Sequence, residues 1–80
     1  MKYVYLLKSV SRPEQRYIGS TTDLKARLEQ HNQGRVPHTS KFVPWEIHVV
    51  IRFKDDRRAE QFERYLKSGS GHAFANRHFW

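Results

Sequence analysis

The 80-residue sequence contains no cysteine, which excludes a disulfide framework, a thiolate nucleophile and a cysteine-based zinc site. Long hydrophobic runs are also missing. The longest covers residues 3–7, whereas a helix that crosses a bilayer needs roughly 18 or more apolar residues. The N-terminus shows no secretory signal pattern. We therefore expect a soluble cytoplasmic protein that has no membrane partner.

Acidic residues are scarce, because 8 Asp and Glu stand against 15 Lys and Arg, which gives a formal net charge of +7. The positive charge is spread along both halves of the chain, so it belongs to a folded surface rather than to a basic tail. This balance favours an acidic ligand, and nucleic acid is the first candidate. About a quarter of the residues are Leu, Ile, Val or Phe, enough for one core but not for two domains. A single monomeric domain over residues 1–80 is expected.

Three segments have the hydrophobic pattern of β-strands. Residues 3–7 are apolar on both alternating faces, which is typical of a strand that is covered on both sides. Residues 16–21 resume a strand-like pattern after a polar segment and predict a hairpin with the first strand. In residues 45–53 the odd-numbered positions are all apolar, which predicts that these side chains share one face of a third strand.

Helical periodicity predicts two helices, over residues about 23–33 and 55–67. Asp23 is a good N-cap for the first helix, and Gly34 is a natural stop after it. The glycine-containing residues 68–71 are expected to end the second helix, and a short third helix over residues 72–80 would depend on packing. Residues 35–44 are expected to form a loop. The predicted fold class is α+β, with a small, mainly antiparallel three-stranded sheet flanked by helices.

Both long helices carry polar residues on their apolar faces. Arg27 and His31 share the helical stripe that holds two leucines, and Glu63 shares the corresponding stripe of the second helix. Such residues on an inward face either belong to a functional site or have a local structural explanation. Arg27 can extend its charge to solvent, and Glu63 can pair with Lys67 one turn later on the helix surface.

Other polar and aromatic residues leave alternatives open. The spacing of the five histidines matches no metal-binding pattern, so structural zinc is not expected, and His48 is predicted to face solvent. Gly69 and Gly71 either simply stop a helix or leave backbone amides free to hold a phosphate. The aromatic C-terminal residues either stack on nucleic-acid bases or pack onto the core.

Two short motifs resemble a known nuclease family. Tyr3-Val4-Tyr5 is followed after eleven residues by Tyr17-Ile18-Gly19, and Arg27 follows inside a helix. This order resembles the GIY-YIG nuclease domain, as in the excision-repair incision subunit and certain homing endonucleases, and it looks closest to small single-domain bacterial members. The first motif differs, because Tyr3 stands in the place of its glycine. The resemblance continues through His31-Asn32, His38-Thr39, Pro44-Trp45, and Ala59 with Glu63 and Lys67.

The resemblance implies a metal-dependent endonuclease that hydrolyses DNA phosphodiester bonds, with a role in DNA repair. Glu63 would hold one Mg²⁺ or Mn²⁺ ion, and Arg27 would bind the negative charge that develops on the phosphate. Tyr17 would take the proton of the attacking water, helped by a hydrogen bond from Tyr5, and His31 is the rival base.

Further basic residues would contact the substrate. The candidates for substrate binding are Lys25, His38, Lys41 and Lys67, and Asn76 lies near the place of a supporting asparagine of the family. The leading alternative function is a noncatalytic basic module that binds nucleic acid, and a third is a protein-interaction domain that uses the aromatic C-terminus. Because so short a chain offers no separate targeting domain, a protein partner is expected to supply specificity.

Overall fold

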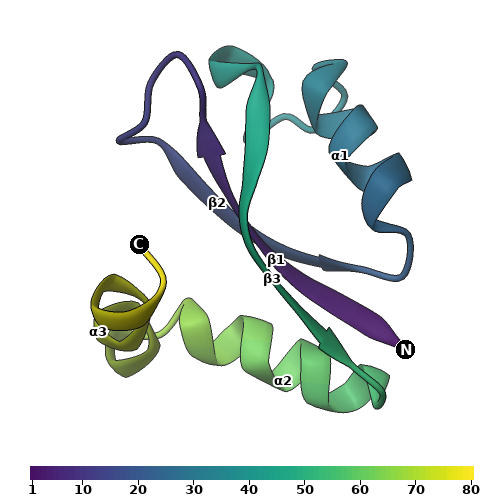
Figure 1. The fold of residues 1–80 in the computed structure, drawn as a ribbon, viewed down its shortest axis with the longest axis vertical. Helices are drawn as coiled ribbons and strands as arrows, with labels where there is room; N and C mark the ends of the chain where they lie inside the picture. The colour runs from purple at the N-terminus through teal and green to yellow at the C-terminus, as the bar shows by residue number, and fades with distance from the viewer.

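The computed structural model describes all residues, 1–80. Its strands are β1 (Lys2–Ser9), β2 (Arg16–Thr21) and β3 (Trp45–Phe53), and its helices are α1 (Leu24–Asn32), the short 3₁₀ helix η1 (Ser40–Phe42), α2 (Asp56–Leu66) and α3 (Gly69–His78). The strands form one antiparallel sheet in the order β2-β1-β3. Helix α1 covers one face of the sheet, and α2 with α3 covers the other (Figure 1). The α+β prediction is confirmed.

The central strand β1 is covered on both sides, as its sequence predicted. Val4, Tyr5, Leu6 and Leu7 are each at most 1% exposed. Val4 and Leu6 pack into a cluster with α2 and α3, whereas Tyr5 and Leu7 pack on the opposite face with Trp45 and residues of α1. Two small cores therefore stabilise the sheet, one on each face, and the edge strand β2 borders both.

The prediction that the apolar side chains of β3 share one face is wrong. The register shifts between Leu6 and Leu7, which pair with Val49 and Ile47, so His48 is an extra residue in a β-bulge. Val49 packs with the α2 side of the sheet, whereas Trp45 packs with the α1 side. A bulge reverses the alternation of a strand, and hydrophobic periodicity alone does not reveal it.

The predicted ends of α1 and α2 are confirmed within one or two residues. The side chain of Asp23 accepts a hydrogen bond from the backbone amide of Ala26, and Asp55 caps α2 in the same way through Arg57. Gly34 follows α1 with a φ of 74°, the left-handed conformation that favours glycine. These caps fix where both helices start relative to the strands before them.

The segment over residues 68–71 differs from the expectation. It does not only end α2, because Ser68 caps α3 and the third helix begins at Gly69. A Cβ atom at Gly71 would overlap the backbone carbonyl of Tyr65, so this glycine allows α3 to pack closely against the end of α2. None of the helices combines the length and hydrophobicity that a membrane crossing requires.

Candidate active site

A chain of hydrogen bonds runs through the core on the α1 side of the sheet. The Tyr5 hydroxyl lies 3.0 Å from Nε2 of His31, and Nε of Arg27 donates to that hydroxyl at 3.3 Å. Nδ1 of His31 lies 2.8 Å from Oγ1 of Thr39. Both His31 and Thr39 are 0% exposed. We call Tyr5, Arg27, His31 and Thr39 the tyrosine–histidine half of the site.

One set of proton positions is consistent with all the hydrogen bonds of this chain. The Thr39 hydroxyl donates to the backbone carbonyl of Val36 at 3.3 Å, so its oxygen accepts from Nδ1–H of His31. Nε2 of His31 then accepts the hydroxyl proton of Tyr5, whose oxygen accepts from Arg27. We therefore assign neutral His31 to the Nδ1–H tautomer.

The environment keeps His31 neutral and Tyr5 protonated. Burial, together with the nearby charge of Arg27, lowers the pKa of His31 to about 4. Burial also raises the pKa of Tyr5, and the hydrogen bond from Arg27 only partly offsets this effect. The same hydrogen bond raises the pKa of Arg27, which stays positively charged. The half therefore contains one permanent cation and two neutral groups.

Gly19 allows two tyrosines to approach each other beside this chain. The rings of Tyr5 and Tyr17 have centroids 6.3 Å apart, and Tyr17 meets His31 edge-on with centroids 4.8 Å apart. A Cβ atom at Gly19 would lie 2.5 Å from the Tyr5 hydroxyl oxygen. The glycine of the second motif is therefore required by packing. Tyr3, in the place of the first glycine, pairs regularly with both neighbouring strands.

A charged cluster lies on the opposite face of the sheet, between β2 and α2. Ser20 of β2 donates to Oε1 of Glu63 at 2.5 Å, and Nζ of Lys67 donates to Oε2 at 2.7 Å. Burial opposes ionisation of Glu63, but the hydrogen bonds from Lys67 and Ser20 outweigh it, so the pKa of the carboxyl group is lower than usual. We call Ser20, Glu63 and Lys67 the glutamate half of the site.

The two halves meet at the free edge of β2. Successive side chains of a strand point to opposite faces, so Tyr17 and Ser20 of this edge strand reach different sides of the sheet. Ser20 and Arg27 line a common hollow of about 250 Å³. A second groove of about 470 Å³, which we call the β2-edge groove, is lined by Arg16, Tyr17, His38, Lys67, His72 and Trp80, among others. An extended ligand along this edge would touch both halves.

The structure brings most of the predicted site residues together. Tyr5, Tyr17, Arg27 and His31 gather on the α1 side, and Glu63 with Lys67 lies across the strand edge. His38 is exposed and lines the β2-edge groove.

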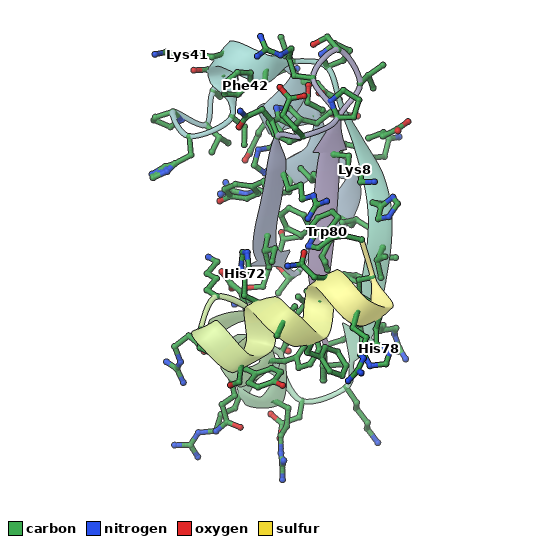
Figure 2. The ribbon with its side chains drawn as sticks, turned by 90° about the vertical axis from the view of Figure 1, so that its left-hand side faces the viewer. Lys8, Lys41, Phe42, His72, His78 and Trp80 are labelled. Carbon is green, nitrogen blue, oxygen red and sulfur yellow. The ribbon has the colours of Figure 1, made fainter.

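Three of the predicted residues lie elsewhere. Lys25 and Lys41 are exposed and line neither hollow, and Lys41 lies far along the molecule from His72 and Trp80 (Figure 2). Asn76 contacts no member of either half, and its side chain instead accepts a hydrogen bond from Arg16.

Two residues of the site were missed by sequence reasoning. Ser20 positions Glu63, and Thr39 positions His31. Thr39 stands beside His38 in the loop predicted over residues 35–44, but nothing in a loop sequence shows which side chain points inward. Its complete burial in the structure identifies its role.

A divalent cation fits the glutamate half. The chain has no group of three or more His, Asp or Glu side chains that could enclose a metal ion by themselves. Mg²⁺ is usually held by one or two carboxylates, with waters and substrate phosphates as the remaining ligands. Glu63 is a half-buried carboxylate with a lowered pKa, and its partner Lys67 lines the β2-edge groove. It therefore offers the single charged ligand that such a substrate-dependent ion needs.

Comparison with known proteins places this geometry in a family. Residues 1–76 match the GIY-YIG catalytic domain. The chain belongs to the GIY-YIG family. It is 43% identical over 82 residues to the structure-specific endonuclease subunit SLX1 of Debaryomyces hansenii, covering 94% of this chain and 22% of the relative. The SLX1 of Candida dubliniensis is 42% identical over 82 residues, with 94% and 27% covered, and that of Malassezia globosa is 47% identical over 64 residues, with 74% and 14% covered.

These relatives refine the expectation from the sequence. The family is confirmed, but these relatives are fungal structure-specific endonuclease subunits, whereas the predicted resemblance was to small bacterial members and the excision-repair incision subunit. The GIY-YIG chain spans about a quarter of the length of the first two relatives. The match supports the expectation of a nuclease enzyme and concerns the catalytic domain alone.

Proposed function

We propose that this GIY-YIG chain is a DNA endonuclease that requires a divalent metal ion and cleaves at the free edge of β2. The observation that carries the proposal is the meeting of Tyr17, Arg27 and Glu63 at this edge, beside two hollows. The net charge of +7 supports a polyanionic substrate. Hydrolysis of a phosphodiester needs an activated water, stabilisation of the developing negative charge and support for the leaving oxygen.

Arg27 is suited to bind the phosphate that is cleaved. Its Nε donates to Tyr5 and its Nη1 donates to Gln30 at 3.1 Å, which fixes the plane of the guanidinium. A guanidinium has five N–H donors, so others stay available for phosphate oxygens. Arg27 forms no ion pair with a carboxylate. Its charge is therefore fixed in place and not neutralised within the protein.

Tyr17 is the better candidate for the base than His31. His31 is 0% exposed, and both of its ring nitrogens are hydrogen-bonded inside the protein, so it has no direct access to a water molecule. Tyr17 is half-buried and lines the β2-edge groove. In this proposal Tyr17 takes the proton from the attacking water, and the tyrosine–histidine half holds Arg27 and the tyrosine rings in position.

Glu63 would hold the Mg²⁺ or Mn²⁺ ion. Such an ion, when bound, polarises a phosphate oxygen and stabilises the leaving oxygen. Ser20 orients one oxygen of Glu63, and Lys67 keeps the carboxylate ionised, so the residue is charged before any ion binds. Each carboxylate oxygen has further lone pairs, and the hydrogen bond from Ser20 does not block them.

The substrate and partner follow from the relatives by analogy. They are named as subunits of structure-specific endonucleases. We infer that this chain likewise selects a DNA structure, such as a branch, rather than a base sequence, and that a protein partner contributes to the choice. The β2-edge groove supports this inference because its charged groups, Arg16 and Lys67, are suited to phosphates, which carry no sequence information.

The test uses the purified chain with plasmid, single-stranded and branched DNA, each in Mg²⁺, Mn²⁺ or EDTA. We expect nicking that depends on the metal and is fastest on branched DNA. A folded chain that binds these DNAs in EDTA but cuts none of them in either metal would instead support the noncatalytic binding module. In that case binding should still fall steeply with rising salt, because phosphate contacts release counterions.

A further inference from the structure

We propose that Arg16 binds the backbone phosphate next to the one that is cleaved, so that the β2-edge groove holds the DNA strand on one side of the scissile bond. This inference rests on the proposed nuclease function and extends it to a residue outside both halves of the site. Three observations carry it: how the Arg16 side chain is held, which groups surround it, and where the groove leads.

Arg16 is held in position by neutral groups. Its Nη1 donates to Oδ1 of Asn76 at 3.0 Å, and its guanidinium carbon lies 4.9 Å from the ring centroid of Trp80. The side chain forms no ion pair. An amide and an aromatic face orient a guanidinium without neutralising it, and its other N–H groups remain able to donate. Arg16 is therefore an ordered, exposed cation with no anionic partner in the protein.

The ring that supports Arg16 is itself fixed from the other edge of the sheet. His48 stacks on Trp80 with centroids 5.5 Å apart and an interplanar angle of 14°. His48 is the extra residue of the bulge in β3, which makes it available for this contact. His48 and Arg16 both contact the Trp80 ring, so this ring is already engaged within the protein rather than open for a nucleic-acid base to stack on. The groove is therefore suited to the sugar–phosphate backbone rather than to a base.

The composition of the groove agrees with an anionic ligand. Its lining contains Arg16, Lys67, His38 and His72, and it contains no Asp or Glu. His72 and Trp80 both lie on the side of α3 that faces the sheet (Figure 2). The positive charge of Lys67 is already paired with Glu63, whereas that of Arg16 is not. Arg16 is thus the group that is best placed to attract a phosphate.

The groove leads to the proposed site of cleavage. Tyr17, the proposed base, follows Arg16 in the chain and lines the same groove. Lys67, which also lines the groove, donates a hydrogen bond to Glu63, the proposed metal ligand. A strand whose scissile phosphate lies between Arg27 and Glu63 would place a neighbouring phosphate beside Arg16. Because Arg16 is already ordered, this contact loses little side-chain entropy on binding.

The first experiment measures DNA binding in EDTA, where no cleavage occurs, for the parental chain, Arg16→Gln and Arg52→Gln. Arg52 is an exposed arginine of β3, at the opposite edge of the sheet, and serves as the charge-matched control. We expect Arg16→Gln to weaken binding roughly tenfold at moderate salt and to reduce the slope of log affinity against log salt by about 1. The Arg52→Gln control should change neither the affinity nor the salt slope by more than a small amount.

The second experiment locates the phosphate. Branched DNAs are prepared with a single uncharged methylphosphonate linkage at successive positions around the mapped cleavage site. The parental chain and the Arg52→Gln variant should lose affinity at the linkage next to the scissile one, and Arg16→Gln should show no further loss there. If Arg16→Gln is as sensitive as the parental chain at every position, the proposal is wrong.

Thermal unfolding separates binding from packing. If Arg16→Gln melts lower while its salt slope and methylphosphonate pattern stay parental, Arg16 only holds the C-terminal segment, and the proposal is overturned. The failure of the proposed function is a different result, because it is the absence of cleavage by the parental chain. If the parental chain does not cleave, the methylphosphonate positions are numbered from the branch point instead. A position that weakens binding by the parental chain but not by Arg16→Gln would then still show that Arg16 binds a phosphate, without any cleavage.

Discussion

The two halves of the candidate site differ in how far they depend on the protein interior. In the tyrosine–histidine half, His31 and Thr39 are 0% exposed, and every buried polar side-chain atom has a partner inside the protein. In the glutamate half, the side chains of Glu63 and Lys67 are 21% and 50% exposed. Buried hydrogen bonds are costly to break, whereas exposed ion pairs contribute little to stability.

This difference separates the work of the two halves. The tyrosine–histidine half fixes Arg27 and the tyrosine rings, and any change in it should alter stability as well as activity. The glutamate half can exchange its partners when an ion or a phosphate arrives, and changes there should affect activity while leaving the fold intact.

The largest effect is expected for Glu63→Gln. The substitution keeps the size of the side chain and an acceptor for Ser20 but removes the charge that would hold a metal ion. Cleavage should fall by roughly a hundredfold or more, while the loss of the helical ion pair should cost no more than about 0.5 kcal/mol of stability. Metal-dependent cleavage and thermal unfolding, measured side by side, check both expectations.

Glu60→Gln is the matched control for this change. Glu60 lies on the same helix and pairs with Lys2 at 2.9 Å, but it contacts neither half of the site. It should retain parental cleavage. A Glu63→Gln variant that cuts DNA at the parental rate would remove Glu63 from the proposed mechanism.

The second prediction concerns acid and the buried histidine. The pKa of His31 is about 4 in the folded chain, and its ordinary value is about 6.5, so the unfolded chain binds more protons between these values. The contribution of His31 to stability is therefore fully present above about pH 6.5 and is lost as the pH falls toward 4. The loss should be on the order of 3 kcal/mol, measured by chemical unfolding at a series of pH values.

Two variants isolate this contribution from the titration of carboxylates. His31→Gln cannot be protonated, so its stability should change less than that of the parental chain between pH 6.5 and 4. His72→Gln removes an exposed histidine and should keep the parental dependence. Equal pH dependence in the parental chain and in His31→Gln would show that the buried imidazole is not the source.

The sequence pointed to Glu63 and Lys67 of the glutamate half and to much of the tyrosine–histidine half, for a physical reason. Arg27, His31 and Glu63 interrupt helical stripes that are otherwise apolar, and a polar residue in such a place needs a partner. The same local patterns predicted the central position of β1 and the caps of α1 and α2. These features depend on neighbours in sequence, which periodicity can detect.

What the sequence did not reveal depends on contacts between distant segments. The bulge at His48 arises from the pairing of β3 with β1, and the burial of Thr39 arises from its contact with His31. Arg16 was counted only as one of many basic residues, because its contact with Asn76 joins β2 to α3. Such positions need the tertiary structure, since no local pattern marks them.

The third prediction breaks the hydrogen-bond chain at its buried end. Thr39→Val keeps the shape of the side chain but leaves Nδ1–H of His31 without an acceptor. We expect a loss of about 1–3 kcal/mol of stability and slower cleavage, because Tyr5 and Arg27 lose their fixed positions. Thr39→Ser retains the hydroxyl group and should therefore keep most of the stability and most of the cleavage rate of the parental chain.

A spectroscopic measurement shows whether the tautomer is the cause. The ¹⁵N chemical shifts of the His31 ring should indicate the Nδ1–H form in the parental chain and in Thr39→Ser, and a mixture of tautomers in Thr39→Val. If the ring nitrogens of Thr39→Val give parental shifts while cleavage is slow, Thr39 acts through packing alone.

The smallest effect is expected for Lys67→Met, which tests whether the glutamate half is tuned by its exposed partner. Lys67 is half-exposed, so the loss of its ion pair should cost only about 0.3–0.5 kcal/mol of stability. The hydrogen bond from Lys67 helps to lower the pKa of Glu63, and without it that pKa should rise. A larger fraction of Glu63 would then be protonated in mild acid, so the acidic limb of the pH–rate profile should move to higher pH while the rate near neutrality changes little.

Lys54→Met, at an exposed position outside both hollows, is the control and should leave the profile in place. An unchanged acidic limb in Lys67→Met would mean that Ser20 alone sets the ionisation of Glu63, whereas a uniform fall in rate at every pH would mean that Lys67 contacts the substrate.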